Sequence, residues 1–97
     1  MTYETITIDD LPPGTQVRGS LYREPCYIEP TDILEVELAS GITIDVSWDA
    51  SAPSHPYRLT VYREYFGDWF ATQFLPTADD VAAEVRRMAW SPPRSYP

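Results

Sequence analysis

The amino-acid sequence predicts an α+β fold, an antiparallel, meander-like sheet of about five to six strands with one C-terminal helix packed on one face. Three observations lead to this fold class. Apolar and polar residues alternate along several segments between residues 3 and 74, as they do in half-buried strands. Residues 78–90 instead show the period of a helix. The links between these segments are short, which favours antiparallel neighbours.

The length of the chain predicts a single hydrophobic core. At 97 residues the chain has the size of one domain, and 43% of its residues are hydrophobic. We expect one α+β domain over residues 1–90 and a proline-rich tail over residues 91–97. The tail has too few apolar residues to fold by itself.

The first two expected strands lie at the N-terminus. Residues 3–8 and residues 16–23 both alternate in polarity, and the prolines and glycine between them predict a turn. Gly19, in the middle of the second segment, indicates a bulge or a close approach of two backbones. Residues 24–30 are bracketed by prolines and predict an irregular connection.

Residues 33–48 carry the strongest pattern, that of a β-hairpin. Directly opposed residues of a hairpin point to the same face, so side-chain facing tests the loop length. A two-residue loop would set Leu38 opposite Thr43 and mix the two faces. A three-residue loop that ends with Gly41 in the left-handed conformation sets apolar residues opposite one another throughout. The predicted pairs are Leu38 with Ile42, Val36 with Ile44 and Leu34 with Val46.

Two further strands and the helix complete the expected fold. Residues 57–64 alternate, and residues 69–74 can return beside them with Phe70 and Phe74 on one face. Thr77 before two aspartates predicts a helix N-cap, and the helix is expected to run to about Trp90. Its apolar stripe, which we expect to pack on the sheet, consists of Ala78, Val81, Ala82, Val85, Met88 and Ala89.

The charge of the chain limits the expected partners. Fifteen acids and seven basic residues, all arginine, give a net charge of −8. Such a surface repels nucleic acid on average, so we expect no direct nucleic-acid binding. No segment has the length of a bilayer span and no export signal is evident, so we expect no membrane association. A single cysteine, Cys26, allows no internal disulfide and favours a cytoplasmic location.

Few residues could serve in catalysis. We interpret His55, the single histidine, as an exposed loop residue rather than an acid–base catalyst. Cys26 as a nucleophile would need His55 beside it. One alternative function is a small-molecule-binding or hydrolytic domain, in which His55 and Asp49 line a pocket between sheet and helix. We expect no catalytic residues and no cofactor.

Metal and nucleotide sites also lack a sequence signal. A closed zinc site needs about four Cys or His ligands, whereas the chain has one of each. The acidic pairs lack the ordered alternation and the glycine of a calcium loop, and no glycine-rich phosphate loop is present. We therefore interpret these pairs as solvated acids or helix-start residues: Asp9 with Asp10, Glu29 with Asp32, and Asp79 with Asp80.

Aromatic residues are dense between residues 57 and 74, beyond what one inner face of a sheet requires. Tyrosine, tryptophan and arginine are the residues that most often anchor protein interfaces. We therefore predict a small acidic, non-enzymatic module that binds another, basic protein, as an inhibitor, immunity-type protein or nucleic-acid mimic. The candidate partner-binding residues are Arg58, Tyr62, Arg63, Tyr65, Phe66 and Trp69.

Two other interpretations of these aromatics stay open. In the first, they fill the core and cover the second face of a small sheet. In the second, the chain is a self-associating subunit, a homo-oligomer in which a strand edge or aromatic face meets its own copy.

The order of the expected elements resembles that of some known small proteins. The hairpin run over residues 34–46, followed by a tyrosine-rich strand and a terminal helix, resembles immunity-type proteins and other small bacterial domains. The likeness covers about half of the chain and contains no functional signature. It therefore implies no site residues.

Overall fold

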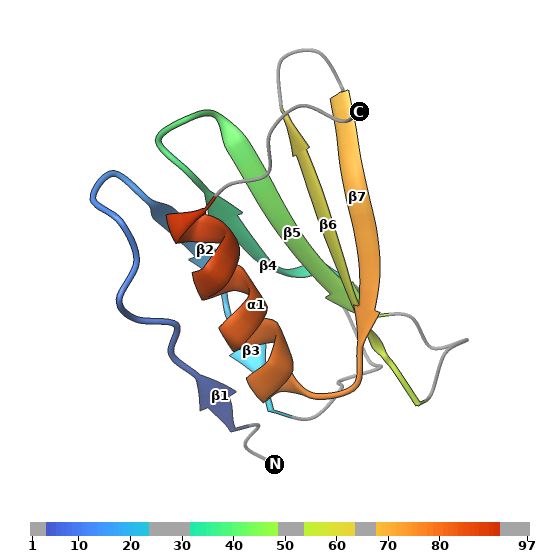
Figure 1. The fold of residues 1–97 in the computed structure, drawn as a ribbon. Helices are drawn as coiled ribbons and strands as arrows, with labels where there is room; N and C mark the ends of the chain where they lie inside the picture. The colour runs from blue at the N-terminus through green and yellow to red at the C-terminus, as the bar shows by residue number, and fades with distance from the viewer. Residues whose placement is uncertain (1–3, 24–31, 49–53, 64–67, 92–97) are drawn as a thin grey trace.

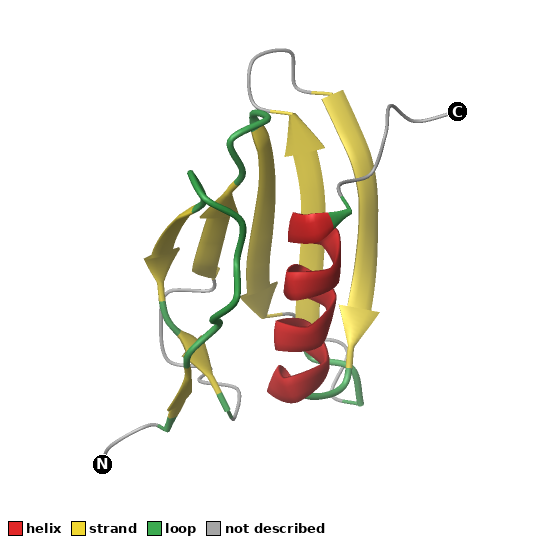
Figure 2. Cartoon of the chain, turned by 60° about the vertical axis from the view of Figure 1, so that its left-hand side comes forward, coloured by secondary structure: helices red, strands yellow, loops and turns green. Residues whose placement is uncertain are grey.

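The structure, a computed structural model, describes residues 4–23, 32–48, 54–63 and 68–91 of the chain. Figure 1 shows a twisted antiparallel sheet with one helix, α1 (Ala78–Trp90), lying across one of its faces. A second, two-stranded sheet lies on the same side as the helix (Figure 2). The predicted fold class, an α+β meander with a single C-terminal helix on one face, is confirmed.

The main sheet has five strands in the order β2-β4-β5-β6-β7, and every neighbouring pair is antiparallel. Successive strands from β4 to β7 therefore lie side by side, and β2 pairs directly with β4 because β3 belongs to the second sheet. The strands are β2 (Gln16–Gly19), β4 (Asp32–Glu37), β5 (Ile42–Trp48), β6 (Tyr57–Arg63) and β7 (Asp68–Leu75).

The hairpin β4–β5 has the predicted register. Leu34 lies opposite Val46 and Val36 opposite Ile44. Gly41 has a φ of 91°. Leu38 N donates to the carbonyl oxygen of Ile42 at 2.8 Å, which closes the three-residue loop. The side-chain facing therefore identified the loop correctly.

The N-terminal region differs from the prediction. Instead of one strand over residues 16–23, the structure has β2 and then β3 (Leu21–Tyr22), which pairs with β1 (Thr5–Ile6). Of the described residues 4–8, only Thr5 and Ile6 form a strand, and this strand belongs to the second sheet. The division occurs at Gly19, whose φ is 89° and whose added Cβ would lie 2.2 Å from the backbone oxygen of Ile33. Gly19 is therefore the close backbone approach that the sequence indicated, and the chain bends away there.

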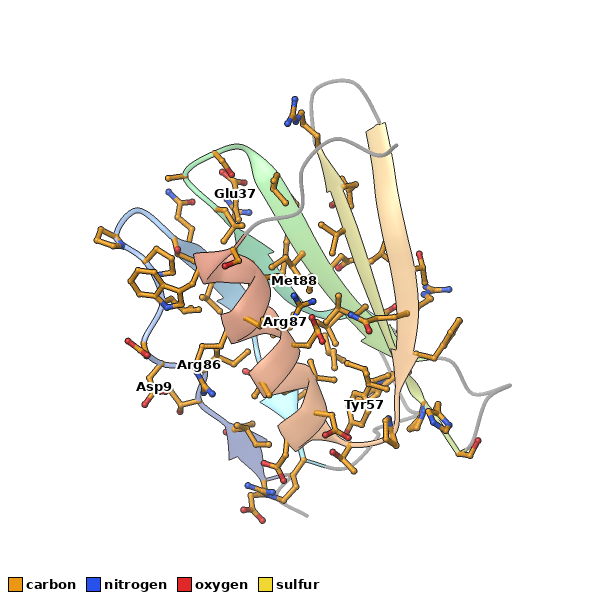
Figure 3. All side chains as sticks on the ribbon, viewed as in Figure 1. Asp9, Glu37, Tyr57, Arg86, Arg87 and Met88 are labelled. Carbon is orange, nitrogen blue, oxygen red and sulfur yellow. The ribbon has the colours of Figure 1, made fainter. Side chains whose placement is uncertain are left out.

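Helix α1 begins and ends where the sequence predicts. The Oγ1 atom of Thr77 accepts a hydrogen bond from Asp80 N at 3.1 Å, and Ser91 N donates to the carbonyl oxygen of Arg87 at 3.0 Å. All six residues of the apolar stripe are buried. They pack with apolar residues of β4, β5 and β6, and Figure 3 shows Met88 and Tyr57 between helix and sheet. The core is therefore the layer between helix and sheet.

Polar contacts tie the N-terminal segment to the helix. Arg86 donates to the carbonyl oxygen of Asp9 at 3.1 Å and to its carboxylate at 3.3 Å, and Figure 3 shows the two residues facing each other. Trp90 Nε1 donates to the carbonyl oxygen of Asp10 at 2.6 Å. Residues 4–15 thus run alongside α1 (Figure 1). Among the described residues, no helix is long and apolar enough to cross a membrane.

Candidate functional site

The two faces of the main sheet differ in what covers them. The face toward α1 carries the buried apolar residues of the strands, such as Val36, Ile44 and Leu59. Side chains alternate along a strand, so the intervening residues lie on the opposite face. We call this opposite surface the outer face. Its described members are Gln16, Arg18, Glu35, Glu37, Thr43, Asp45, Ser47, Arg58, Thr60, Tyr62, Thr72 and Phe74.

On the β2 side, the outer face is a cluster of charged residues. Arg18 Nη1 lies 2.8 Å from Glu35 Oε1 and 3.6 Å from Glu37 Oε2, and Arg18 also donates to Gln16. The side chain of Arg18 is 57% exposed and those of Glu35 and Glu37 are 39% and 30% exposed, and ion pairs this accessible to water stabilise a fold by about 0–1 kcal/mol. The cluster therefore sets the charge pattern of this part of the face more than its stability.

On the β7 side, the outer face combines an arginine with an exposed aromatic ring. Arg58 and Phe74 are directly opposed on β6 and β7. Arg58 is half-buried, and its Nε donates to Ser47 Oγ at 3.0 Å, which holds the side chain along the sheet. Phe74 is 44% exposed, among the largest exposures of a big apolar side chain in the described part of the chain. An oriented guanidinium thus lies next to an uncovered aromatic side chain.

The centre of the outer face is polar and closely covered. Thr43 and Ser47, both on β5, are each 1% exposed. Ser47 accepts the hydrogen bond from Arg58, whereas Thr43 Oγ1 has no hydrogen-bond partner among the described residues. Thr43 lies between Glu37 and Tyr62, the residues opposite it on the neighbouring strands. Longer neighbouring side chains therefore shield the short side chains of the central strand.

The structure brings part of the predicted partner-binding set together. Arg58 and half-buried Tyr62 lie on the outer face, and the backbone of Trp69 is directly opposite Tyr62. Arg63 is exposed at the end of β6, opposite Ile42, and belongs by alternation to the helix-covered face. Tyr65 and Phe66 lie outside the described residues. The structure thus separates Arg63 from Arg58 and Tyr62.

Other aromatics of this region belong to the core. Tyr57 and Trp48 are 1% and 4% exposed, and their ring centroids lie 5.2 Å apart. Phe74 is not among the binding residues predicted from the sequence. Strict alternation from the buried Leu59, carried through the register of β6 and β7, is the signal that places Phe74 on the outer face.

The candidate catalytic and metal residues are not gathered in the described part of the chain. His55 is exposed, and its Nδ1 lies 3.1 Å from Ser54 Oγ, whereas Cys26 and Asp49 fall outside the described residues. No group of three or more His, Cys, Asp or Glu side chains that could hold a metal ion occurs among the described residues.

Arginines contact two of the acids considered as metal ligands. Asp9 contacts Arg86, and Asp79 accepts a hydrogen bond from Arg23 at 3.1 Å. Arg23 also donates to Glu4 at 3.0 Å. The hydrogen bond that Arg23 donates to Glu4 and the charge of Asp79 raise the pKa of Arg23 above its usual value. These acids therefore connect the N-terminal segment to the second sheet and the helix.

Comparisons with protein-family models, with curated protein sequences and with solved structures give no match. The candidate site therefore rests on the geometry of this chain alone.

Proposed function

We propose that this chain is a small acidic module that binds another protein through the outer face of its sheet. The partner is a protein with a basic surface. The exposure of Phe74 beside the oriented guanidinium of Arg58 is the observation that carries the proposal.

The residue types of the β7 side support this proposal. Binding energy at protein interfaces is concentrated in a few aromatic and arginine side chains, surrounded by residues that exclude water. Phe74 and Arg58 supply such a pair, and Tyr62 lies on the same face of β6. Ser47 restrains Arg58 before binding, so less conformational entropy is lost when a partner contacts it.

Two threonines add hydrogen-bonding groups to the proposed docking surface. Thr60 and Thr72 lie opposite each other on β6 and β7, and their Oγ1 atoms are 3.3 Å apart. Threonine hydroxyls can donate hydrogen bonds to a partner and accept hydrogen bonds from it. Trp69, Tyr65 and Phe66 stay predicted contributors to the same interface.

The net charge supports a basic partner. A charge of −8 on 97 residues produces a long-range field that accelerates encounter with positively charged surfaces. Phe74 and Arg58 act at short range, where they slow dissociation. We therefore expect the association rate to fall steeply with salt and the dissociation rate to depend mainly on the outer face.

The experiment begins with capture of the tagged chain's partner from its own cell lysate at low and high salt, followed by identification by mass spectrometry. The purified partner is then titrated by calorimetry against the wild type, Phe74→Ala and Val17→Ala. Val17 is the matched control because its exposed fraction, 45%, is nearly the same as that of Phe74. Val17 pairs with Val36, however, and therefore lies on the helix-covered face.

We expect Phe74→Ala to weaken binding about tenfold or more and Val17→Ala to leave the dissociation constant unchanged. Equal affinities of the two variants and the wild type would exclude the outer face. The absence of any stoichiometric partner at either salt would overturn the binding-module proposal. The nature of the purified partner, a cellular enzyme, a toxin or a nucleic-acid-binding protein, then distinguishes an inhibitor from an immunity-type protein and a nucleic-acid mimic.

A further inference from the structure

We propose that the free edge of β7 pairs antiparallel with β7 of a second copy of this chain and extends the sheet across a twofold axis. This inference goes beyond the proposed function because it concerns another surface and another partner. β7 is the longest strand in the described part of the chain, and it pairs there with β6 alone. Figures 1 and 2 show α1 over a face of the sheet and not along the outer edge of β7.

The backbone groups at the edge of β7 indicate that its partner is another extended strand. An edge strand presents a row of backbone N–H and C=O groups, and another extended strand can pair with the whole row. Between Trp69 and Leu75 the sequence has no charged residue and no proline, which are the residues that commonly block such pairing. The register shifts once, at Phe70, and residues 71–75 pair without interruption with residues 57–61. The free side of this segment is therefore an uninterrupted template.

The other edge of the main sheet is protected. β2 has four residues, and its Arg18 forms ion pairs with Glu35 and Glu37 of the neighbouring strand. The strand ends at Gly19, where the chain bends away. Short length and charge both oppose pairing with another chain. The contrast between the two edges identifies β7 as the one open to pairing.

The charge distribution favours a second copy as the occupant. Residues 57–75 contain two arginines, one glutamate and one aspartate, so the formal charge of this ribbon is 2 − 2 = 0 in a chain of −8. Two copies of the chain repel one another overall because both carry a net negative charge. This repulsion is weakest where residues 57–75 of one copy meet the same residues of the other, because this segment has no net charge. A second β7 also offers an edge of equal length that is uncharged from Trp69 to Leu75. An isologous pair of this kind closes on itself.

The twofold pairing has a geometric consequence for the outer face. Antiparallel pairing of identical edges requires a twofold axis perpendicular to the sheet, so both helices lie on one side and both outer faces lie on the other. The dimer then has one continuous outer face with two Arg58–Phe74 pairs. A partner with two matching sites would be held at both, with higher avidity than either contact alone provides.

The test combines mass and backbone protection. Sedimentation velocity of the full chain over a wide concentration range should show a mass that rises from monomer to dimer. High salt should strengthen this association because it screens the repulsion between like net charges. Hydrogen exchange should show that the amides of residues 71–75 that point away from β6 become more protected as the protein concentration rises. Binding of a basic partner weakens with salt instead, so a failure of this proposal is distinct from a failure of the proposed function.

Two variants at Thr72 test whether the edge of β7 forms the dimer contact. Thr72→Lys places a charge in the middle of the uninterrupted segment and should raise the dimer dissociation constant about tenfold or more. Thr72→Val loses the same contact with Thr60 but adds no charge, so it should keep the dimer. Thermal unfolding checks that both variants fold.

Three results would overturn the proposal. The first is a monomer mass at every concentration and salt. The second is a dimer that forms while the amides of β7 stay unprotected, which would assign the contact to another surface. The third is protection of β7 only when a purified partner is added, which would make the occupant an extended segment of another protein.

Discussion

The hydroxyl of Tyr57 donates a hydrogen bond to the carbonyl oxygen of Tyr22 at 2.9 Å, and the carbonyl oxygen of Arg23 lies 3.0 Å from the same hydroxyl. Tyr57 is 1% exposed and belongs to β6 of the main sheet, whereas Tyr22 ends β3 of the second sheet. A buried tyrosine thus connects the two sheets that the bend at Gly19 separates.

We predict that Tyr57→Phe lowers the free energy of unfolding by about 1–2 kcal/mol, because two carbonyl oxygens in a part-buried site lose their donor while the ring stays in place. Tyr57→Ala also removes the packing against Trp48 and should cost about 3–5 kcal/mol. Urea unfolding of the three proteins measures both values. A phenylalanine variant as stable as the wild type would show that the hydroxyl does not contribute.

A comparison of Gly19 with Gly41 distinguishes the cost of a steric contact from the cost of backbone strain. Their φ angles are nearly equal, 89° and 91°, but a Cβ at Gly41 would meet no atom within 4 Å. We predict that Gly41→Ala costs about 1–2 kcal/mol, the usual cost of a left-handed alanine. Gly19→Ala should cost at least about 3 kcal/mol because the backbone near Ile33 must also move. Equal losses in urea unfolding would contradict the close approach at Gly19.

The N-cap of α1 gives a prediction with a conservative control. Thr77→Ala removes the acceptor of the Asp80 amide and should lower the free energy of unfolding by about 1 kcal/mol. Thr77→Ser keeps a hydroxyl at the same position and should retain most of the stability. Chemical unfolding compares the two variants, and an equal loss in both would show that the methyl group, and not the cap, matters.

The helix and the hairpin β4–β5 were predictable because their signals are local. Thr77, the spacing of the apolar stripe and the end near Trp90 all lie within one segment. Gly41 and the alternation on each side of it define the hairpin register without reference to other strands. Local propensity, capping and side-chain facing agree at these positions, which is why the predicted bounds match the structure.

The second sheet was not predictable because it depends on a contact between distant residues. Alternation continues from β2 into β3, and the sequence alone cannot show that Gly19 meets Ile33 and turns the chain out of the main sheet. Among the described residues, strand β1 pairs only with the short strand that this bend creates, so residues 4–8 form less strand than their pattern suggests.

The candidate site was predictable only where the alternation of a single strand defines it. Arg58 and Tyr62 follow from the alternation of one strand, since Leu59 and Val61 are buried between them. The place of Phe74 depends on the register of β6 against β7, which sets Phe74 opposite Arg58. Alternation within one strand does not reveal which residue of the neighbouring strand lies opposite, because the register depends on how two strands pair.

Two buried hydroxyls on the outer face of β5 give the last prediction. Thr43 and Ser47 are equally buried, but Ser47 Oγ accepts a hydrogen bond from Arg58, whereas Thr43 Oγ1 has no partner among the described residues. Replacement of an unpartnered buried hydroxyl by a methyl group of similar shape removes a desolvation cost. We therefore expect Thr43→Val to raise the free energy of unfolding by about 1 kcal/mol.

The matched variant, Ser47→Ala, should act in the opposite direction. It removes the acceptor of the Arg58 Nε hydrogen bond and should lower the free energy of unfolding by about 1–2 kcal/mol. Loss of this restraint should also weaken partner binding, because Arg58 then loses more conformational freedom when it docks. Urea unfolding and calorimetric titration measure the two effects separately. A Thr43→Val variant that is less stable than the wild type would mean that the Thr43 hydroxyl has a partner, and that the centre of the outer face is held by a hydrogen bond there.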